Sequence, residues 1–271
     1  MAACYTRGRM RTSWRTWLLP LLTLLVLLGA WFFAASRGWL VRPTGPGTQI
    51  ALFPSPAETQ AGLAELSRDG RLLKDTLASL GRVLMAYVLS VAAGVPLGLW
   101  LGRVAAAREA LLPILNFLRA LSPLAWIPFA VLWLGTGDTT VVVLLLLAAL
   151  PPVAVTTAAA VASIPKVYFR VAADYGLHGG KLFVQVLLPA VLPQLVTMLR
   201  VTMGLCWLVL VAAEMIAGDR GVGFLIQDAN QSLRPDLILV GMLVIGALGI
   251  AFDRLLMLLT RVPSLRWGWD K

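Results

Sequence analysis

The sequence predicts an all-α integral membrane protein with six transmembrane helices. Hydrophobic residues make up 59% of its 271 residues and charged residues only 13%, against about 45–50% and about 25% in soluble domains. Each of six apolar segments is long enough to cross a hydrocarbon core of about 30 Å at about 1.5 Å per helical residue. These segments use most of the chain, so we expect one membrane domain and no separate soluble domain.

The apolar segments and the charges between them give the expected topology. The segments span approximately residues 17–35, 82–101, 111–134, 140–162, 184–217 and 237–259. With the N-terminus inside, the inner side carries fourteen cations and four acids, whereas the outer side carries seven cations and eight acids. This asymmetry follows the positive-inside rule. We therefore expect both termini in the cytoplasm, and the net charge of +10 needs no nucleic-acid partner.

The chain divides into four regions around these segments. They are a basic cytoplasmic tail (1–16), a first helix with an outer connector (17–81), a helical core (82–260) and a second cytoplasmic tail (261–271). The first apolar segment has the basic flank of a signal peptide, but its apolar run is too long for one.

The outer connector contains one predicted helix. Pro43, Gly45, Pro46 and Gly47 indicate an extended chain before it. The stretch Ser55-Pro-Ala-Glu58 then has the spacing of a capping box, with proline at the first helical position. We expect a short amphipathic helix carrying Leu63 and Leu66 to follow it and to lie on the periplasmic face of the membrane.

Small residues recur at every fourth position of the second apolar segment. They are Ala86, Ser90, Gly94, Gly98 and Gly102. Such a stripe allows two helices to approach closely. It is typical either of a packing face in a moving bundle or of ordinary membrane-helix packing, and small-residue spacing is so common in membrane helices that we favour the second interpretation.

Polar residues inside apolar segments are the candidates for a translocation path, because ionisable groups in a bilayer usually face a bundle interior or a watery route. The candidates are Arg119, Ser122, Trp126, Arg200 and Glu214. For Arg200, lining a path and pairing within the bundle are equally open. Glu214 fits a structural or gating partner better, since an acid repels an anionic solute. Arg82 and Arg119 fit boundary residues whose charged ends reach the interface, and Trp126 fits bundle packing better than ligand stacking.

The tandem Pro151-Pro152 predicts a break in the fourth segment, with the neighbouring Thr156 and Thr157 bonding to the freed carbonyls.

The chain also lacks several kinds of site. Two cysteines, Cys4 and Cys206, and a single histidine, His178, offer neither a disulfide nor a metal cluster. No phosphate loop, nucleophile motif or catalytic carboxylate pair is present, so an energy source would lie in another subunit.

The loop after the fourth segment carries the most specific pattern. It reads Arg170-Val-Ala-Ala-Asp-Tyr-Gly176 and is followed by Val186-Leu-Leu-Pro189. This spacing resembles the "EAA" loop of ABC-importer permeases: Glu-x-Ala, a Gly six residues after the Glu, and Ile-x-Leu-Pro ending thirteen residues after that Gly. The positions on the pattern are Ala172, Gly176, Val186, Leu188 and Pro189. Arg170 stands where the Glu would be.

Further stretches resemble the branch of these permeases that imports nitrate, sulfonates, taurine and bicarbonate. They are Phe53-Pro-Ser-Pro56, residues 118–135, residues 207–218 and residues 221–225, so the resemblance covers about residues 53 to 260. It implies a type I ABC-importer permease in the bacterial inner membrane, with lipid around it, that pairs with a second copy of itself. Two ATPase subunits and a periplasmic substrate-binding protein would complete the importer.

The resemblance also implies a role for the loop at residues 166–181, as a coupling helix seated on the ATPase. The implied coupling residues are Arg170, Ala172, Ala173, Asp174, Gly176, Leu177, His178 and Lys181. ATP and Mg would be used by the ATPase, and this chain would hold no cofactor. A channel or membrane enzyme without an ATPase, and a permease for a neutral cofactor precursor, are the alternatives.

Overall fold

The computed structural model describes residues 15–37, 41–45, 48–51 and 53–259. In chain order the elements are α1 (Arg15–Ser36), β1 (Val41–Gly45), β2 (Thr48–Ala51), α2 (Pro56–Arg68), α3 (Arg71–Arg103), α4 (Ala105–Ala120), η1 (Pro123–Trp126), α5 (Ile127–Leu134), α6 (Asp138–Ala162), α7 (Lys166–Asp174), α8 (Gly179–Leu182), η2 (Phe183–Leu187), α9 (Leu188–Ala217), α10 (Val222–Gln231) and α11 (Pro235–Leu259). Both predicted tails lie almost entirely outside the described residues.

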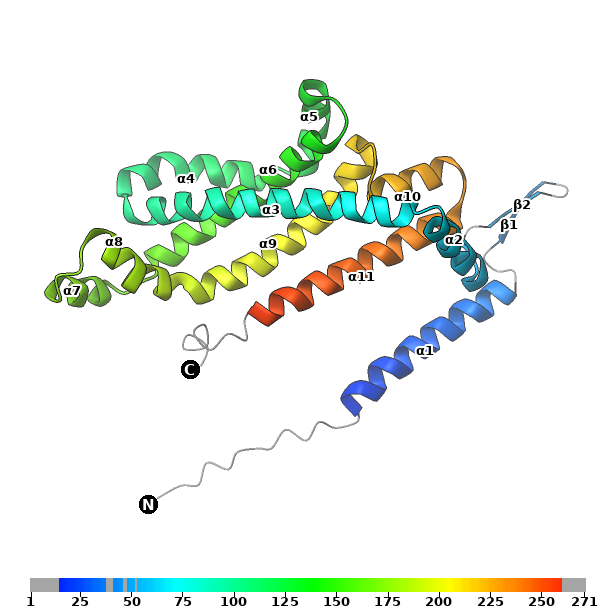
Figure 1. Cartoon of the computed structure of the whole chain (residues 1–271), viewed down its shortest axis with the longest axis horizontal. Helices are drawn as coiled ribbons and strands as arrows, with labels where there is room; N and C mark the ends of the chain where they lie inside the picture. Colours follow the sequence, from blue (N-terminus) through cyan, green and yellow to red (C-terminus); the bar gives the residue numbers. More distant parts are fainter. Residues whose placement is uncertain (1–14, 38–40, 46–47, 52, 260–271) are drawn as a thin grey trace, which may run out of the picture.

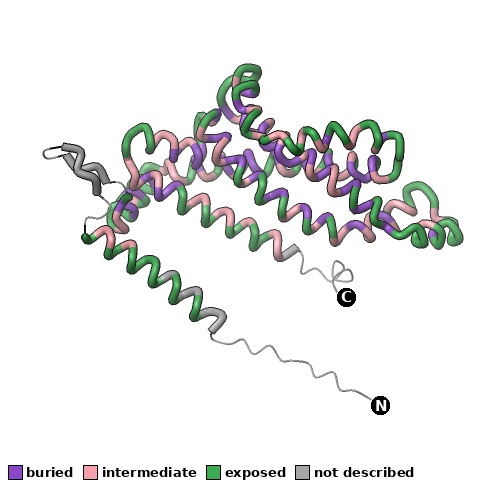
Figure 2. The backbone as a smooth tube through the Cα atoms, turned by 180° about the vertical axis from the view of Figure 1, so that it is seen from behind, coloured by how far each residue is buried: buried purple, intermediate pink, exposed green. Residues whose placement is uncertain are grey.

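The centre of the molecule is a bundle of α3, α6 and α9 (Figure 1). Helix α6 is the most enclosed of the three, and α3 and α9 pack along its length. Figure 2 shows buried residues concentrated where these helices meet. α7 and α8 lie at one end of the bundle and α10 lies at the other. We call these the α7 end and the α10 end.

The small-residue stripe of α3 is the face that packs on α6. A side chain added at Gly94 would lie 2.8 Å from Val153, and one added at Gly102 would lie 2.5 Å from Val161. At Gly98 an added Cβ would meet the carbonyl oxygen of Ala154. The prediction of a close packing face is therefore confirmed, and glycine is needed because the α6 backbone approaches α3 directly.

The third apolar segment, predicted as one span, is a pair of helices joined at a sharp bend. α4 ends at Ala120, and the pair formed by α4 and the η1–α5 unit is bent by 88°. Pro123 explains the bend, because proline disfavours helical dihedrals in the residue before it. Ser122 is accordingly extended, with φ −62° and ψ 125°. As a result α5 projects away from the bundle (Figure 1).

The structure also differs from the predicted start of the core and from the predicted break at Pro151-Pro152. α3 begins at Arg71, eleven residues before the predicted start of the core at residue 82, so the border between 17–81 and 82–260 falls inside a helix. α6 continues through Pro151 and Pro152 without a break. The hydroxyl of Thr157 donates to the carbonyl of Val153 at 2.7 Å, which is not a carbonyl that the prolines leave free.

Within the described residues, four helical stretches are long and apolar enough to cross a membrane. They are Arg71–Arg103, Asp138–Ala162, Gly179–Ala217 and Pro235–Met257, and the bent pair gives a fifth if it counts as one span. α1 contributes a shorter apolar stretch, Leu25–Ser36. The fold is helical and membrane-spanning, as predicted, while the count of six spans stays a prediction.

The N-terminal part lies beside the bundle. α1 stands apart from it (Figures 1 and 2), and Trp31 of α1 donates its Nε1 hydrogen to the carbonyl of Pro54 at 2.9 Å. The connector predicted as extended forms an antiparallel hairpin in which Val41 pairs with Ala51.

The capping box that begins α2 is confirmed. Glu58 Oε2 accepts from the Ser55 amide at 2.7 Å, and the Ser55 side chain accepts from the Glu58 amide. Leu66 packs against α10 and α11, whereas Leu63, expected on the same face, is exposed. α2 is therefore held to the α10 end of the bundle.

Candidate functional site

The predicted coupling loop forms a short helix with a glycine-dependent end. α7 stops at Asp174, and Gly176 adopts the left-handed conformation with φ +68°. The amide of Leu177 donates to the Ala172 carbonyl at 2.8 Å, and the amide of Gly176 donates to the Ala173 carbonyl at 2.9 Å. These bonds form a Schellman-type cap, in which glycine avoids the steric penalty of a left-handed residue.

α7 presents an apolar and aromatic face to its surroundings. Val167, Tyr168 and Val171 are about half exposed, and Tyr175 is 81% exposed. Of the predicted coupling residues, Ala172 is buried and Leu177 is half-buried, while the others are exposed: Arg170, Ala173, Asp174, Gly176, His178 and Lys181. Tyr168 and Tyr175 are not among the predicted coupling residues, although their seven-residue spacing places them on one helical face.

The turn between α8 and α9 is π-helical. The amide of Leu188 donates to the carbonyl of Phe183, five residues back. Pro189 follows and has no amide hydrogen to donate. The Val186-Leu-Leu-Pro189 part of the motif thus covers the end of the widened turn and the start of α9. This type of distortion is frequent at functional sites.

The α10 end contains a buried ion-pair cluster centred on Arg82 of α3. Arg82 is 4% exposed, and its Nη1 atom lies 2.7 Å from Oε1 of Glu214, which is 1% exposed. Its guanidinium also donates to Asp219 at 3.0 Å and to Asp138 at 2.6 Å. One arginine therefore connects α3, the start of α6, α9 and the α9–α10 turn.

The carboxylate of Glu214 is bonded on its other side to Ser79 and to the start of α10. The Ser79 hydroxyl lies 2.7 Å from Oε2 of Glu214, and the amide of Gly223 donates to the same oxygen at 3.0 Å. The Ser79 oxygen accepts from the Val222 amide at 2.9 Å. A side chain at Gly223 would lie 2.7 Å from the Glu214 Cβ, so the helix start can close on the carboxylate only without one.

The interpretation of Arg82 as a boundary residue is therefore wrong. Its partner Glu214 is 132 residues away in sequence, and no local pattern indicated the pair. Outside the spans, the hydrogen bond to Asp138 raises the pKa of Arg220 above its ordinary value. Arg220 thus keeps its charge at the rim of the cluster.

The five predicted path residues are not brought together. Glu214 is enclosed in the ion-pair cluster, and Arg200 pairs with Asp253 of α11 at 2.9 Å on another side of α9. Arg119 and Ser122 are exposed near the bend after α4. Trp126 packs against the core and lies 6.4 Å from Phe129 between ring centroids. Their shared role as a path stays a prediction.

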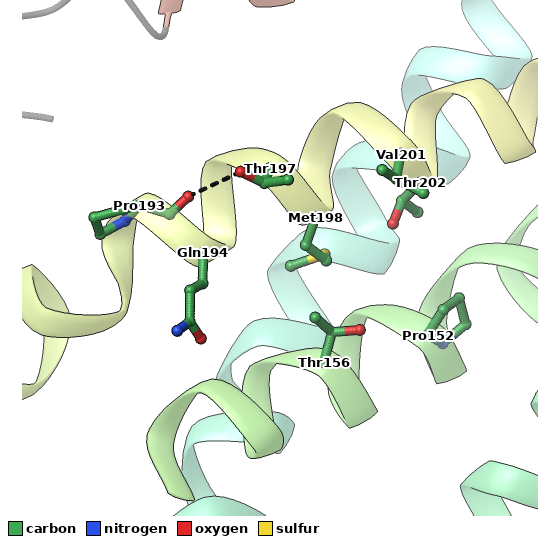
Figure 3. Close-up of a pocket in the computed structure, with 8 residues that line it drawn as sticks. All are labelled: Pro152, Thr156, Pro193, Gln194, Thr197, Met198, Val201 and Thr202. Carbon is green, nitrogen blue, oxygen red and sulfur yellow. Dashed lines mark hydrogen bonds between the residues drawn. The ribbon is translucent and has the colours of Figure 1, made fainter. Parts of the chain in front are cut away.

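A groove of about 530 Å³ lies instead between α6 and α9 (Figure 3). None of the five predicted path residues lines it. Its wall contains threonine and glutamine side chains among proline and methionine: Pro152, Thr156, Pro193, Gln194, Met198 and Thr202. The described groove residues carry no formal charge, so the groove can hold a solute only through neutral hydrogen bonds and apolar contact.

Residues 94–264 match the family described as binding-protein-dependent transport system inner membrane component. This chain belongs to that family. The permease is 33% identical over 236 residues to the taurine transport system permease protein TauC of Escherichia coli, with 85% of this chain and 83% of TauC covered. It is 34% identical over 242 residues to the bicarbonate transport system permease protein CmpB of Synechocystis, with 87% and 84% covered.

Solved structures support the fold of the permease. A chain of a bacterial alginate ABC transporter, in complex with a pentasaccharide-bound periplasmic protein, matches with a TM-score of 0.65 at 13% identity, covering 91% of this chain and 95% of that one. A chain of the inward-facing MetNI methionine ABC transporter matches with a TM-score of 0.56 at 20% identity, covering 72% and 99%. The permease therefore has the helical fold of ABC importer membrane subunits.

Proposed function

We propose that this permease forms the membrane pathway of an ATP-driven importer as a pair of identical copies. Each copy docks an ATPase subunit at α7, and a periplasmic binding protein delivers the solute at the α10 end. The observation that carries the proposal is the α7 end itself, where a capped helix exposes Val167, Tyr168, Val171 and Tyr175. Exposed apolar patches of this kind mark interaction sites.

The connections of α7 suit the transmission of force. α7 follows α6 directly and joins α9 through α8 and the π-helical turn, so movement of α7 reaches both helices that form the groove. ATP-driven closure of the ATPase pair would rotate these helices as rigid bodies and alternate the access of the pathway. ATP and Mg act in the ATPase, and this chain transmits the movement from α7 to α6 and α9.

The orientation follows from the charge distribution. The α7 end carries Lys166, Arg170 and Lys181, whereas acids outnumber cations on the opposite side. The positive-inside rule supports a cytoplasmic α7 end and cytoplasmic termini in a bacterial inner membrane. The α10 end, with α2 and the hairpin, would then face the periplasm.

The proposed solute is small and bears an oxyanion. The relatives named above transport taurine and bicarbonate, and similarity over more than four-fifths of the chain supports a solute of that kind. A neutral cofactor precursor is the second candidate, because the groove between α6 and α9 carries no charge.

The docking function is tested by Tyr175→Glu, which places a charge on the most exposed residue of the α7 face. We expect it to abolish recovery of an ATPase subunit with the tagged permease, and to abolish ATP-driven taurine or bicarbonate uptake, while the protein still inserts. Leu233→Glu is the matched control for ATPase recovery and insertion, because Leu233 is 76% exposed in a loop at the opposite end. Unchanged ATPase recovery with Tyr175→Glu would show that the exposed face of α7 is not the docking site. No ATPase recovery with the parental chain would favour a channel without an ATPase.

A further inference from the structure

We propose that the groove between α6 and α9 is a solute-recognition niche, which holds the oxyanion of a small solute through uncharged hydroxyl and amide donors. The inference rests on the proposed import function and names the chemistry of its pathway. It places recognition away from Arg200 and Glu214, two of the charged candidates for the path.

Two hydroxyl groups in the groove have no partner within the described chain. Thr202 of α9 is only 3% exposed, and its hydroxyl makes no hydrogen bond to any described residue. Figure 3 shows it pointing from α9 toward α6. The Thr156 hydroxyl of α6 is likewise unbonded and lines the same space. The hydroxyl of a side chain as buried as Thr202 normally has a partner. Thr202, together with the half-buried Thr156, is therefore poised for a ligand or for water that a ligand replaces.

The neighbouring side chains complete a polar end and an apolar wall. The amide of Gln194 has only one long contact, 3.5 Å from its Nε2 atom to Ser163. Thr197 is different, because its hydroxyl already donates to the Pro193 carbonyl at 3.2 Å (Figure 3). Pro152 and Pro193 add rigid apolar surface. The available donors are therefore the hydroxyls of Thr156 and Thr202 and the second amide hydrogen of Gln194.

Neutral donors suit a site that must release what it binds. Conduction needs binding that is favourable enough for entry and weak enough for exit. A hydrogen bond from a neutral donor to an anion contributes a modest free energy, whereas an arginine in a low-dielectric site would hold an anion far more strongly. Arg200 is unsuited in position too, because it lies two residues from Thr202, about 200° around the helix, and faces Asp253.

Occupancy can be measured without the ATPase. Val201 is 71% exposed at the groove, so Val201→Cys in a Cys4→Ser background gives a reporter thiol, and the remaining Cys206 is buried. We expect taurine or bicarbonate to slow its alkylation about threefold at about twice the dissociation constant. Ethanolamine at equal ionic strength, which lacks the oxyanion, should not slow it. Equal protection by ethanolamine, no protection by any probe, or cross-linking of the thiol to a second copy would overturn the proposal.

Removal of the two hydroxyls tests the donors themselves. Thr156→Val with Thr202→Val keeps shape and should abolish the protection and raise the KM of uptake about tenfold or more, the loss expected for hydrogen bonds to a charged group. The matched control is Thr157→Val, because the Thr157 hydroxyl already donates to Val153 outside the groove. If the double variant does not fold, each single variant is measured by the same protection. Protection that persists without the hydroxyls overturns the niche, whereas protection without ATPase recovery contradicts only the import function.

Discussion

The two ends of the bundle differ in the burial of their charged side chains. At the α10 end, Arg82 and Glu214 are buried, and every polar group of the pair has a partner from α3, α6, α9 or α10. At the α7 end, charged and aromatic side chains are exposed, and a short helix is held mainly by its connections to α6 and α9. One end fixes helices to each other, and the other leaves a surface free for a partner.

This difference is one of burial more than of composition, since both ends use arginine and aspartate. A buried ion pair is stable only when its hydrogen bonds are complete, because removal from water costs several kcal/mol per ion. An exposed charge pays no such cost and contributes little by itself. We therefore expect substitutions at the α10 end to alter stability, and substitutions at the α7 end to alter coupling.

The largest expected effect is that of Arg82→Ala. It leaves the Glu214 carboxylate buried without its cation, which typically destabilises by about 3–5 kcal/mol. The measurement is thermal unfolding of the detergent-solubilised protein, where the melting temperature should fall sharply. Adding Glu214→Gln to Arg82→Ala removes the unpaired charge and should restore part of the stability. A single variant that melts at the parental temperature would show that the cluster does not hold the helices together.

How far the sequence predicted these two ends depended on the range of the interactions. The capping box at Ser55 and the stripe at Gly94 and Gly98 are local patterns, and both predictions are confirmed. The Arg82–Glu214 pair joins segments that are distant in sequence, so the sequence alone predicts Arg82 at the membrane–water interface and not in a buried pair. The bend at Pro123 follows from the restriction that proline places on the residue before it. It was not predicted, because the apolar segment is long enough to form one span. The groove between α6 and α9 could not be predicted, because its hydroxyls meet only through packing.

An intermediate effect is expected for Gly176→Val at the α7 end. Gly176 has φ +68°, and a non-glycine residue in this conformation costs about 1–3 kcal/mol. The strain falls on the α7 cap, so ATP-driven uptake and ATPase recovery should drop while the helical bundle still melts near the parental temperature. Gly180→Val is the control, because a Cβ there meets nothing within 4 Å and φ is not positive. Equal losses in the two variants would mean that the cap geometry is irrelevant to docking.

The smallest effect is expected for Arg200→Gln, which compares the exposed ion pair of Arg200 with the buried ion pair of Arg82. Arg200 pairs with Asp253 as Arg82 pairs with Glu214, but its side chain is 34% exposed and that of Asp253 is 51% exposed. Pairs exposed to this extent contribute about 0–1 kcal/mol, so the melting temperature should change little. Uptake should also stay near the parental rate, because Arg200 faces α11 and not the groove. A large loss of uptake with intact assembly would return Arg200 to the path and limit the groove to a secondary role. Asp253→Asn separates the two explanations, since it leaves Arg200 charged: a path role predicts retained uptake, whereas a role for the ion pair predicts the same loss as Arg200→Gln.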